Sequence, residues 1–186
     1  EVSMRKALLA GLLAISMMAH SSEHTFSNVQ LDNMRYAYQF GEQFSKDGKY
    51  KTHKNIHKSG LGHIMAAILW QESSGGVNLK SKPKHHAYGM FQNYLPTMRA
   101  RVKELGYNMT DAEIKRMLNK RSNSASWAYI ELSYWLNIHK GDIRKAISSY
   151  NSGWNVKAGS KYASEVLEKA NYLKNNKLLE IVNFLR

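Results

Sequence analysis

The feature that most constrains the fold is a short apolar segment that ends abruptly at a cluster of turn residues. Its apolar side chains recur at helical spacing, at Leu61, Met65, Ile68 and Leu69. Only Gly62, near its start, is a poor helix former. The pattern predicts a helix from about residue 61 to residue 73, which the sequence Ser74-Gly75-Gly76 brings to an end.

Similar patterns elsewhere predict a mainly helical chain. Pro96 suits the first turn of a helix that Gly106 closes, and Thr110 to Glu113 forms a capping box for the next one. Further helices are expected over 25–44, 124–139, 143–150 and 162–173, with a short one over 177–184. The basic segment 49–58 and the polar segment 77–86 read as loops. Between Glu72 and Gln92 we expect at most a short irregular β-hairpin or a loop.

Length and composition are those of one compact domain. The chain has 186 residues, of which 43% are hydrophobic, enough to bury a core without help from metal or disulfide. Cysteine is absent, which excludes disulfides, thiol nucleophiles and thiolate metal sites. His53 and His57 lack the acidic partner of a metalloprotease pattern, so neither a metal nor a cofactor is expected.

The N-terminal residues have the pattern of a secretory signal peptide. Arg5 and Lys6 precede an uncharged apolar run, Ala7 to Ala19, and small polar residues follow it. This run is shorter than the roughly 20 residues of a membrane span. We therefore expect residues 1–22 to be a signal peptide, with Met4 as the natural start, and residues 23–186 to form the domain, with its core over about 60–175. Export to the periplasm or the extracellular cell wall follows, and a retained signal-anchor is the alternative.

The basic charge indicates a polyanionic partner. The formal net charge is +13, and the basic residues are spread along the chain instead of forming one arm. For an exported protein, the anions to expect are cell-wall polymers, stem-peptide carboxylates of peptidoglycan, or lipid headgroups. Nucleic acid is not expected, and charge alone does not choose among the others.

Glu72 is the residue that most deserves a chemical role. It lies at the end of the predicted helix, with apolar neighbours on one side and open space on the other. Desolvation there would raise its pKa and keep the carboxyl protonated near neutral pH, ready to donate a proton to a leaving group. Judged by position alone, however, a solvated glutamate at a helix end is the ordinary interpretation.

The segments that follow Glu72 favour a chemical role for it over a merely solvated side chain. Together they resemble the soluble lytic transglycosylase family of lysozyme-like proteins. Glu72-Ser73 is similar to the catalytic Glu-Ser pair of that family. The other three matching pieces are Ala87-Tyr88-Gly89-Met90-Phe91-Gln92, similar to Ala-x-Gly-Leu-Met-Gln; Ser149-Tyr150-Asn151-Ser152-Gly153, similar to Ala-Tyr-Asn-x-Gly; and Tyr162 to Val166, similar to Tyr-x-x-x-Val. The resemblance covers about Leu61 to Leu173, and the order of the pieces makes it specific.

The resemblance implies a mainly α, lysozyme-like single domain that cleaves the β-1,4 bond between N-acetylmuramic acid and N-acetylglucosamine in peptidoglycan. Glu72 would act as acid and then as base, with the muramyl 6-hydroxyl as nucleophile and a 1,6-anhydro product. Ser73 and Gln92 would contact the sugar, Tyr150 and Asn151 would shape the floor, and Tyr162 would orient Glu72. Besides Glu72, only Glu165 is acidic in the matched pieces, and we expect it on a helix surface.

Two other functions stay open at this stage. A muramidase of the same fold would use water as the nucleophile, and a non-catalytic module would only bind glycan strands. The expected partners are peptidoglycan strands and a secretion, conjugation or phage lysis apparatus, with the protein itself a monomer. The sequence departs from the family pattern in two places. The gap between Glu72 and Gln92 is slightly longer and carries basic residues, namely Lys80, Lys82, Lys84, His85 and His86. The Asn-containing segment of the family is only loosely present, with Asn123 and Ala128 nearby, and no site role is assigned to these two.

Overall fold

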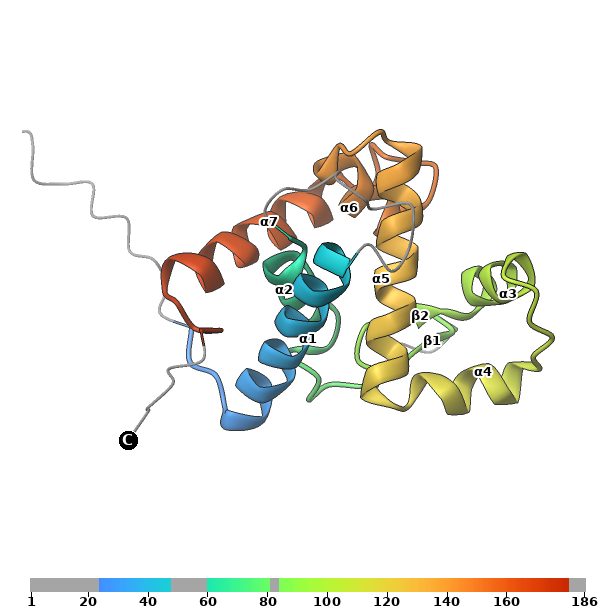
Figure 1. Ribbon diagram of the computed structural model, residues 1–186, viewed down its shortest axis with the longest axis horizontal. Coiled ribbons are helices and arrows are strands. Elements are labelled where there is room, and N and C mark those ends of the chain that lie inside the picture. The colour runs from blue at the N-terminus through green and yellow to red at the C-terminus, as the bar shows by residue number, and fades with distance from the viewer. Residues whose placement is uncertain (1–23, 48–59, 81–83, 181–186) are drawn as a thin grey trace, which may run out of the picture.

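The computed structural model describes residues 24–47, 60–80 and 84–180, and within these ranges it is mainly helical (Figure 1). The described helices are α1 (Asn28–Asp47), α2 (Gly62–Ser73), α3 (Leu95–Glu104), α4 (Asp111–Leu118), α5 (Arg121–Ile138), α6 (Ile143–Ser152) and α7 (Ser160–Asn175). One antiparallel sheet is described, formed by β1 (Ala87–Tyr88) and β2 (Asn93–Tyr94), with Ala87 paired to Tyr94 and Tyr88 to Asn93. The predicted mainly α fold with a short hairpin is confirmed.

Helix α2 lies at the centre of the larger group of helices. Both α1 and α7 pack against it, and α5 and α6 complete the surrounding core. Its side chains Met65, Ala66, Ala67, Ile68 and Leu69 are all buried, so the helix is enclosed on most of its circumference. An enclosed helix has no wide polar face, which is why apolar residues dominate this segment.

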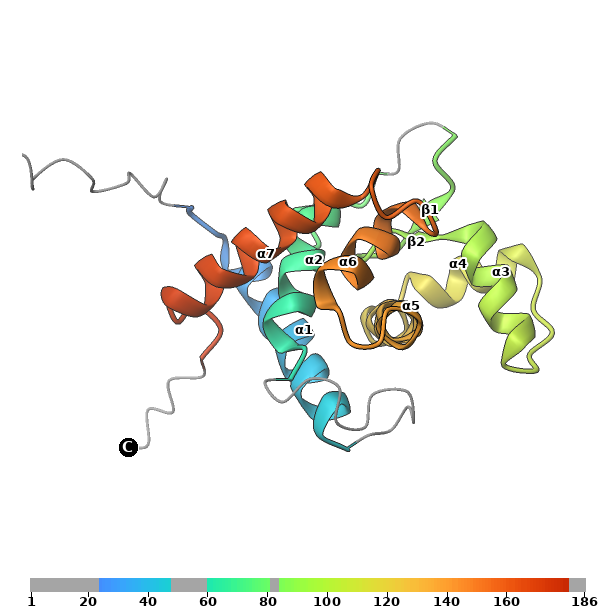
Figure 2. The same ribbon diagram turned by 90° about the horizontal axis from the view of Figure 1, so that it is seen from above.

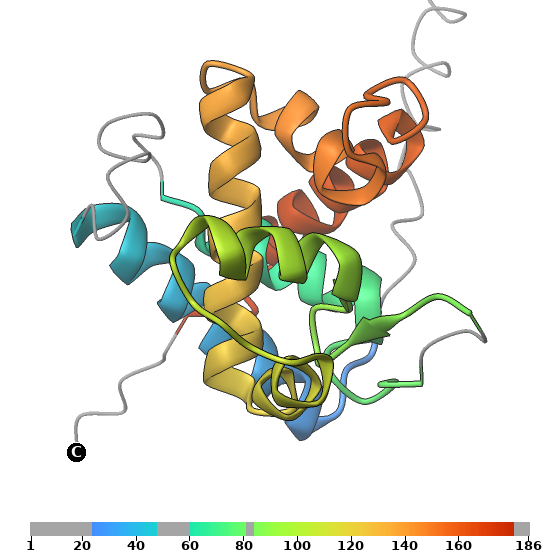
Figure 3. The ribbon, with the colours of Figure 1, turned by 90° about the vertical axis from the view of Figure 1, so that its right-hand side faces the viewer.

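A second, smaller hydrophobic cluster lies beyond α5. Its buried residues come from α3, α4 and one side of α5, and are Leu95, Met98, Val102, Ile114, Leu118 and Trp127. The opposite side of α5 contributes to the larger core, so this helix is shared by the two clusters. Figures 1 and 2 show α3, α4 and the hairpin on one side of α5 with α1, α2 and α7 on the other, and Figure 3 shows α3 crossing in front of α5.

The helix ends follow the capping residues of the sequence. The Thr110 capping box is present, and the Asp142 side chain accepts a hydrogen bond from the backbone N–H of Lys145 at the start of α6. The helix expected over 177–184 does not form where the chain is described: residues 176–179 are turns, and Lys177 has a left-handed φ of 52° that a continuing helix does not allow.

Some predictions fall outside the described residues. These are the signal peptide over 1–22, the loop segment 49–58 with His53 and His57, and the last part of the segment 177–184. In the part of the chain that the structure describes, no helix is long and apolar enough to cross a membrane.

The contact between α1 and α2 depends on two facing glycines. A Cβ atom on Gly41 would lie 2.9 Å from the backbone of Leu61 and Gly62, and one on Gly62 would lie 2.7 Å from the backbone oxygen of Tyr38. Backbone atoms cannot move aside as a flexible side chain can. The absence of side chains at these two positions therefore sets how closely the two helices approach.

We expect Gly41→Ala to destabilise the protein by about 1 to 3 kcal/mol, because the added methyl group forces α1 away from α2. Helix propensity alone would make the alanine variant more stable by about 1 kcal/mol. The sign of the change in the free energy of unfolding therefore shows whether packing or propensity is the larger effect. Urea unfolding monitored by circular dichroism measures it. Gln43→Ala, at an exposed position of the same helix, is the matched control, and equal stability of wild type and Gly41→Ala would contradict the close packing.

Candidate active site

The position of Glu72 is fixed by the way in which α2 ends. Ser74 caps the helix in a left-handed conformation with φ of 55°. Two side chains of α1 then hold the turn: Gln30 Nε2 donates to the carbonyl of Ser74 at 2.8 Å, and Asn33 Nδ2 donates to that of Gly75 at 3.0 Å. These bonds satisfy carbonyl groups of the turn that follows the helix, which have no partner within the helix itself.

Ser73 lies in a different place from the one that the family resemblance implied. Its side chain is 1% exposed and is not among the cavity-lining groups. The hydroxyl donates to the carbonyl of Met90 at 2.6 Å and accepts from the backbone N–H of Gly76 at 3.0 Å. Ser73 therefore ties the end of α2 to the hairpin segment, and in this conformation its hydroxyl does not face a sugar.

The other five predicted site residues converge on one cavity of about 700 Å³. The lining groups among them are Glu72, Gln92, Tyr150, Asn151 and Tyr162. The end of α2, the hairpin, α3, α5, α6 and the start of α7 all contribute to its walls. The cavity thus opens where the smaller cluster of helices meets the larger one, a common place for a binding site.

Burial raises the pKa of Glu72 from 4.5 to about 7, and a hydrogen bond opposes this increase. The phenol of Tyr162, at the start of α7, donates to Glu72 Oε1. Desolvation disfavours the charged carboxylate, whereas the hydrogen bond stabilises it. Desolvation is the larger effect, so the carboxyl group is protonated in a substantial fraction of molecules at neutral pH.

The two tyrosines beside Glu72 are uncharged hydrogen-bond donors. Burial raises the pKa of both Tyr150 and Tyr162 well above the usual value, and the nearby Glu72 raises each further. The hydroxyl of Tyr150 donates to the carbonyl of Phe91 at 3.3 Å. Tyr150 therefore connects α6 to the hairpin, whereas Tyr162 is the one that contacts the Glu72 carboxyl group.

Gln92 lies at the tight turn of the hairpin. Its backbone has a left-handed φ of 47°, and its side-chain amide Nε2 donates to the carbonyl of Gly89 at 2.9 Å. The side-chain carbonyl oxygen has no hydrogen-bond donor from the described residues. Since Gln92 lines the cavity, this oxygen is a candidate acceptor for a ligand hydroxyl or N–H group.

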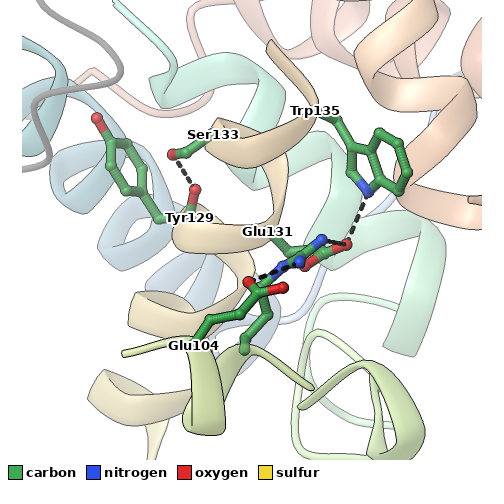
Figure 4. Close-up of polar contacts among 6 residues, drawn as sticks. Glu104, Tyr129, Glu131, Ser133 and Trp135 are labelled. Atoms are coloured by element: carbon green, nitrogen blue, oxygen red, sulfur yellow. Dashed lines mark hydrogen bonds and ion pairs between the residues drawn. The ribbon is translucent and has the colours of Figure 1, made fainter. Parts of the chain in front are cut away.

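Sequence reasoning missed a second carboxyl group in the cavity wall, Glu131 of α5. Arg101 Nε of α3 donates to Glu131 Oε2 at 2.8 Å, and the Trp135 indole N–H donates to Oε1 at 2.7 Å (Figure 4). The Arg101 guanidinium also binds Glu104 and lies 3.4 Å from the ring centre of Tyr134. A signal was present in the sequence, because Glu131 is the one charged residue in the apolar segment 124–139.

The described residues contain no group of three or more His, Cys, Asp or Glu side chains that could hold a metal ion. Glu165 is partly exposed, as expected on the surface of α7, and it accepts a hydrogen bond from Gln71 Nε2 at 2.8 Å. The functional groups that surround the Glu72 carboxyl in the cavity wall include the hydroxyls of Tyr150 and Tyr162 and several amides, and basic side chains also line the cavity.

A lysozyme-like helical domain with a partly buried glutamate in its cavity is the class that the fold and the site define. Residues 45–173 match the model of the family described as Transglycosylase SLT domain. The chain belongs to this family, whose typical activity is cleavage of peptidoglycan of the lytic transglycosylase type. No solved structure gives a significant match.

The raised pKa of Glu72 predicts a specific dependence of stability on pH. Between about pH 4.5 and 7 the folded protein holds a proton that the unfolded chain has released, so the free energy of unfolding falls by about 3 kcal/mol as pH rises through this range. Glu72→Gln removes this contribution. We expect the variant to gain about 3 kcal/mol relative to wild type between pH 4.5 and 8, measured by urea unfolding.

The control variant is Glu168→Gln, which exchanges a carboxyl for an amide at an exposed position of the helix that carries Tyr162. A stability difference between Glu72→Gln and wild type that stays constant with pH would show that Glu72 is not desolvated in the folded protein.

Proposed function

We propose that this protein is a lytic transglycosylase that cleaves the β-1,4 bond between N-acetylmuramic acid and N-acetylglucosamine and leaves a 1,6-anhydro end. Glu72 acts first as general acid and then as general base. The observation that carries the proposal is the position of the Glu72 carboxyl in a cavity between two groups of helices, where Tyr162 donates to it and burial raises its pKa to about 7. A carboxyl group with this pKa is still protonated in part at neutral pH, as the first step requires, and donating that proton produces the carboxylate that acts in the second step.

In the first step, the protonated Glu72 donates to the glycosidic oxygen as the bond to the muramyl anomeric carbon breaks. The carboxylate that remains accepts a hydrogen bond from Tyr162, which supports it as negative charge develops. In the second step, this carboxylate removes the proton from the 6-hydroxyl of the same muramyl residue as that oxygen bonds to the anomeric carbon. Glu72 ends the cycle protonated.

The state of Glu131 supports a mechanism with a single free carboxyl group. A hydrolase of the retaining or inverting kind uses a second carboxyl as nucleophile or base. Among the described residues, Glu131 is the other carboxyl that lines the cavity, and both of its oxygens are engaged by Arg101 and Trp135. A nucleophile from the substrate itself does not need such a group, and intramolecular attack gains from its high effective concentration.

The proposal also includes the place where the protein acts, which is the cell wall outside the cytoplasm. The predicted signal peptide takes the protein out of the cytoplasm, where the basic surface favours the anionic cell wall. Opening the wall for phage lysis, or for a secretion or conjugation apparatus, is the setting that fits a small basic enzyme of this kind.

Product analysis tests the reaction directly. We expect mass spectrometry of digested peptidoglycan to find anhydromuropeptides, and Glu72→Gln to lower their rate of formation by about 10²- to 10⁴-fold, since the amide cannot donate or accept the proton. Glu168→Gln is the matched control and retains the wild-type products. Reducing ends instead of anhydro ends would identify a muramidase, and binding without cleavage by every variant would identify a glycan-binding module.

The pH dependence of the rate tests the roles of Glu72 and Tyr162 together. The acid step requires protonated Glu72, so kcat/KM is expected to fall above about pH 7, approaching a tenfold loss for each further unit. The Tyr162 hydrogen bond lowers the pKa of Glu72. Removing it in Tyr162→Phe should move the fall to higher pH, and a profile that stays in place or moves to lower pH would contradict this role.

A further inference from the structure

One edge of the cavity carries positive charge that the proposed chemistry does not use. Lys80, Lys84 and His85 line the cavity, and all three are exposed. They belong to the chain between α2 and β1. Lys80 and Lys84 are called the basic edge below.

The charges elsewhere in the cavity leave the basic edge without a carboxylate partner. Arg101 and Glu131 neutralise each other through their ion pair at 2.8 Å. Glu72 is protonated in a substantial fraction of molecules at neutral pH. Among the described residues, neither Lys80 nor Lys84 forms an ion pair. A ligand in the cavity therefore meets an excess of positive charge on this side.

We infer that the basic edge binds carboxylates of the stem peptides, so that the protein acts preferentially on strands whose peptides carry free carboxylate groups. The inference rests on the proposed function and specifies its substrate class. It does not concern the sugars, because the lactyl carboxyl of muramic acid is used in the amide bond to the stem peptide, so a peptide-bearing sugar offers no charge of its own for a lysine to bind.

The covalent structure of peptidoglycan places these carboxylates near the basic edge of the cavity. Each stem peptide is attached through the lactyl group of a muramic acid residue, the sugar whose anomeric carbon reacts at Glu72. An extended peptide advances by about 3.3 to 3.6 Å per residue, so carboxylates of a short peptide lie within roughly 10 Å of that sugar. Lys80 and Lys84 share the cavity with Glu72, and their long side chains can follow a mobile peptide.

Exposed lysine pairs of this kind contribute modestly. A pair between an exposed ammonium and a carboxylate is weak in water, and it weakens further with salt. The basic edge should therefore produce a preference of about three- to tenfold between substrates, and not an absolute requirement.

The experiment compares two substrates whose peptide carboxyl groups are charged in one and neutral in the other. One is intact peptidoglycan sacculi, and the other is the same sacculi after their peptide carboxylates have been converted to neutral methylamides with a carbodiimide and methylamine. We expect wild type to show a kcat/KM about three- to tenfold higher on the intact form at low ionic strength. The double variant Lys80→Ser/Lys84→Ser should lose this preference, and added salt should reduce it in wild type.

The control variant Lys120→Gln/Lys174→Gln removes the same charge from exposed positions outside the cavity lining and should keep the preference. Binding of Glu72→Gln to both forms of sacculi, with and without the lysine substitutions, gives a second readout that needs no cleavage. The preference must appear there as well, so the inference is decided even if the proposed reaction is wrong.

Equal action on the two substrates would overturn the inference while leaving the proposed function intact. The same conclusion follows if the control variant loses the preference together with the double variant. Inhibition of wild type by inorganic polyphosphate, with no inhibition of the double variant and no effect of methylamidation, would assign the basic edge to a phosphate polymer instead.

Discussion

The desolvation of the Glu72 carboxyl group is the constraint on which the rest of the structure depends. A carboxyl at a helix end is ordinarily solvated, and keeping it partly dry requires protein on several sides. Helix α2 supplies this position because α1, α5, α6 and α7 enclose it. The facing glycines of α1 and α2 allow that enclosure to be tight, and the side chains of Gln30 and Asn33 hold the chain where α2 ends.

The cavity in front of Glu72 depends in turn on the sharing of α5 between two hydrophobic clusters. The ion pair of Arg101 with Glu131 joins α3 to α5 at this boundary, with side chains only 10% and 14% exposed. A buried ion pair gains little stability over an apolar contact, but its geometry is specific. We interpret it as the contact that orients the smaller cluster across the cavity. It also engages both carboxylate oxygens of Glu131, whereas the Glu72 carboxyl accepts its hydrogen bond from the uncharged Tyr162.

Local signals in the sequence predicted most of the helices, because apolar periodicity and capping residues act within a few residues of each other. Thr110, Asp142 and the turn after Ser73 mark helix ends where the structure has them. Glu72, Gln92, Tyr150, Asn151 and Tyr162 are brought together as the family resemblance implied.

The failures of sequence reasoning have a common cause, which is that the partners are distant in the chain. The hydroxyl of Ser73 donates a hydrogen bond to the carbonyl of Met90, and no local sequence pattern reveals this contact. Glu131 acquires its place in the cavity wall from Arg101, thirty positions earlier. The basic segment before β1 reads as a solvated loop until the fold places Lys80 and Lys84 at the cavity. Such contacts depend on how helices cross, which periodicity does not specify.

The opposition between burial and the Tyr162 hydrogen bond would allow one carboxyl group to serve both steps of the proposed reaction. If burial acted alone, the pKa of Glu72 would rise further and the carboxyl group would be a weaker acid for the first step of the proposed reaction. If the hydrogen bond acted alone, the pKa would fall and the acid would be absent for the first. With both present the pKa is about 7, where donating and accepting a proton are nearly balanced. The buried, uncharged phenol of Tyr162 suits this role, because it stabilises the carboxylate without adding a positive charge that would suppress the acid.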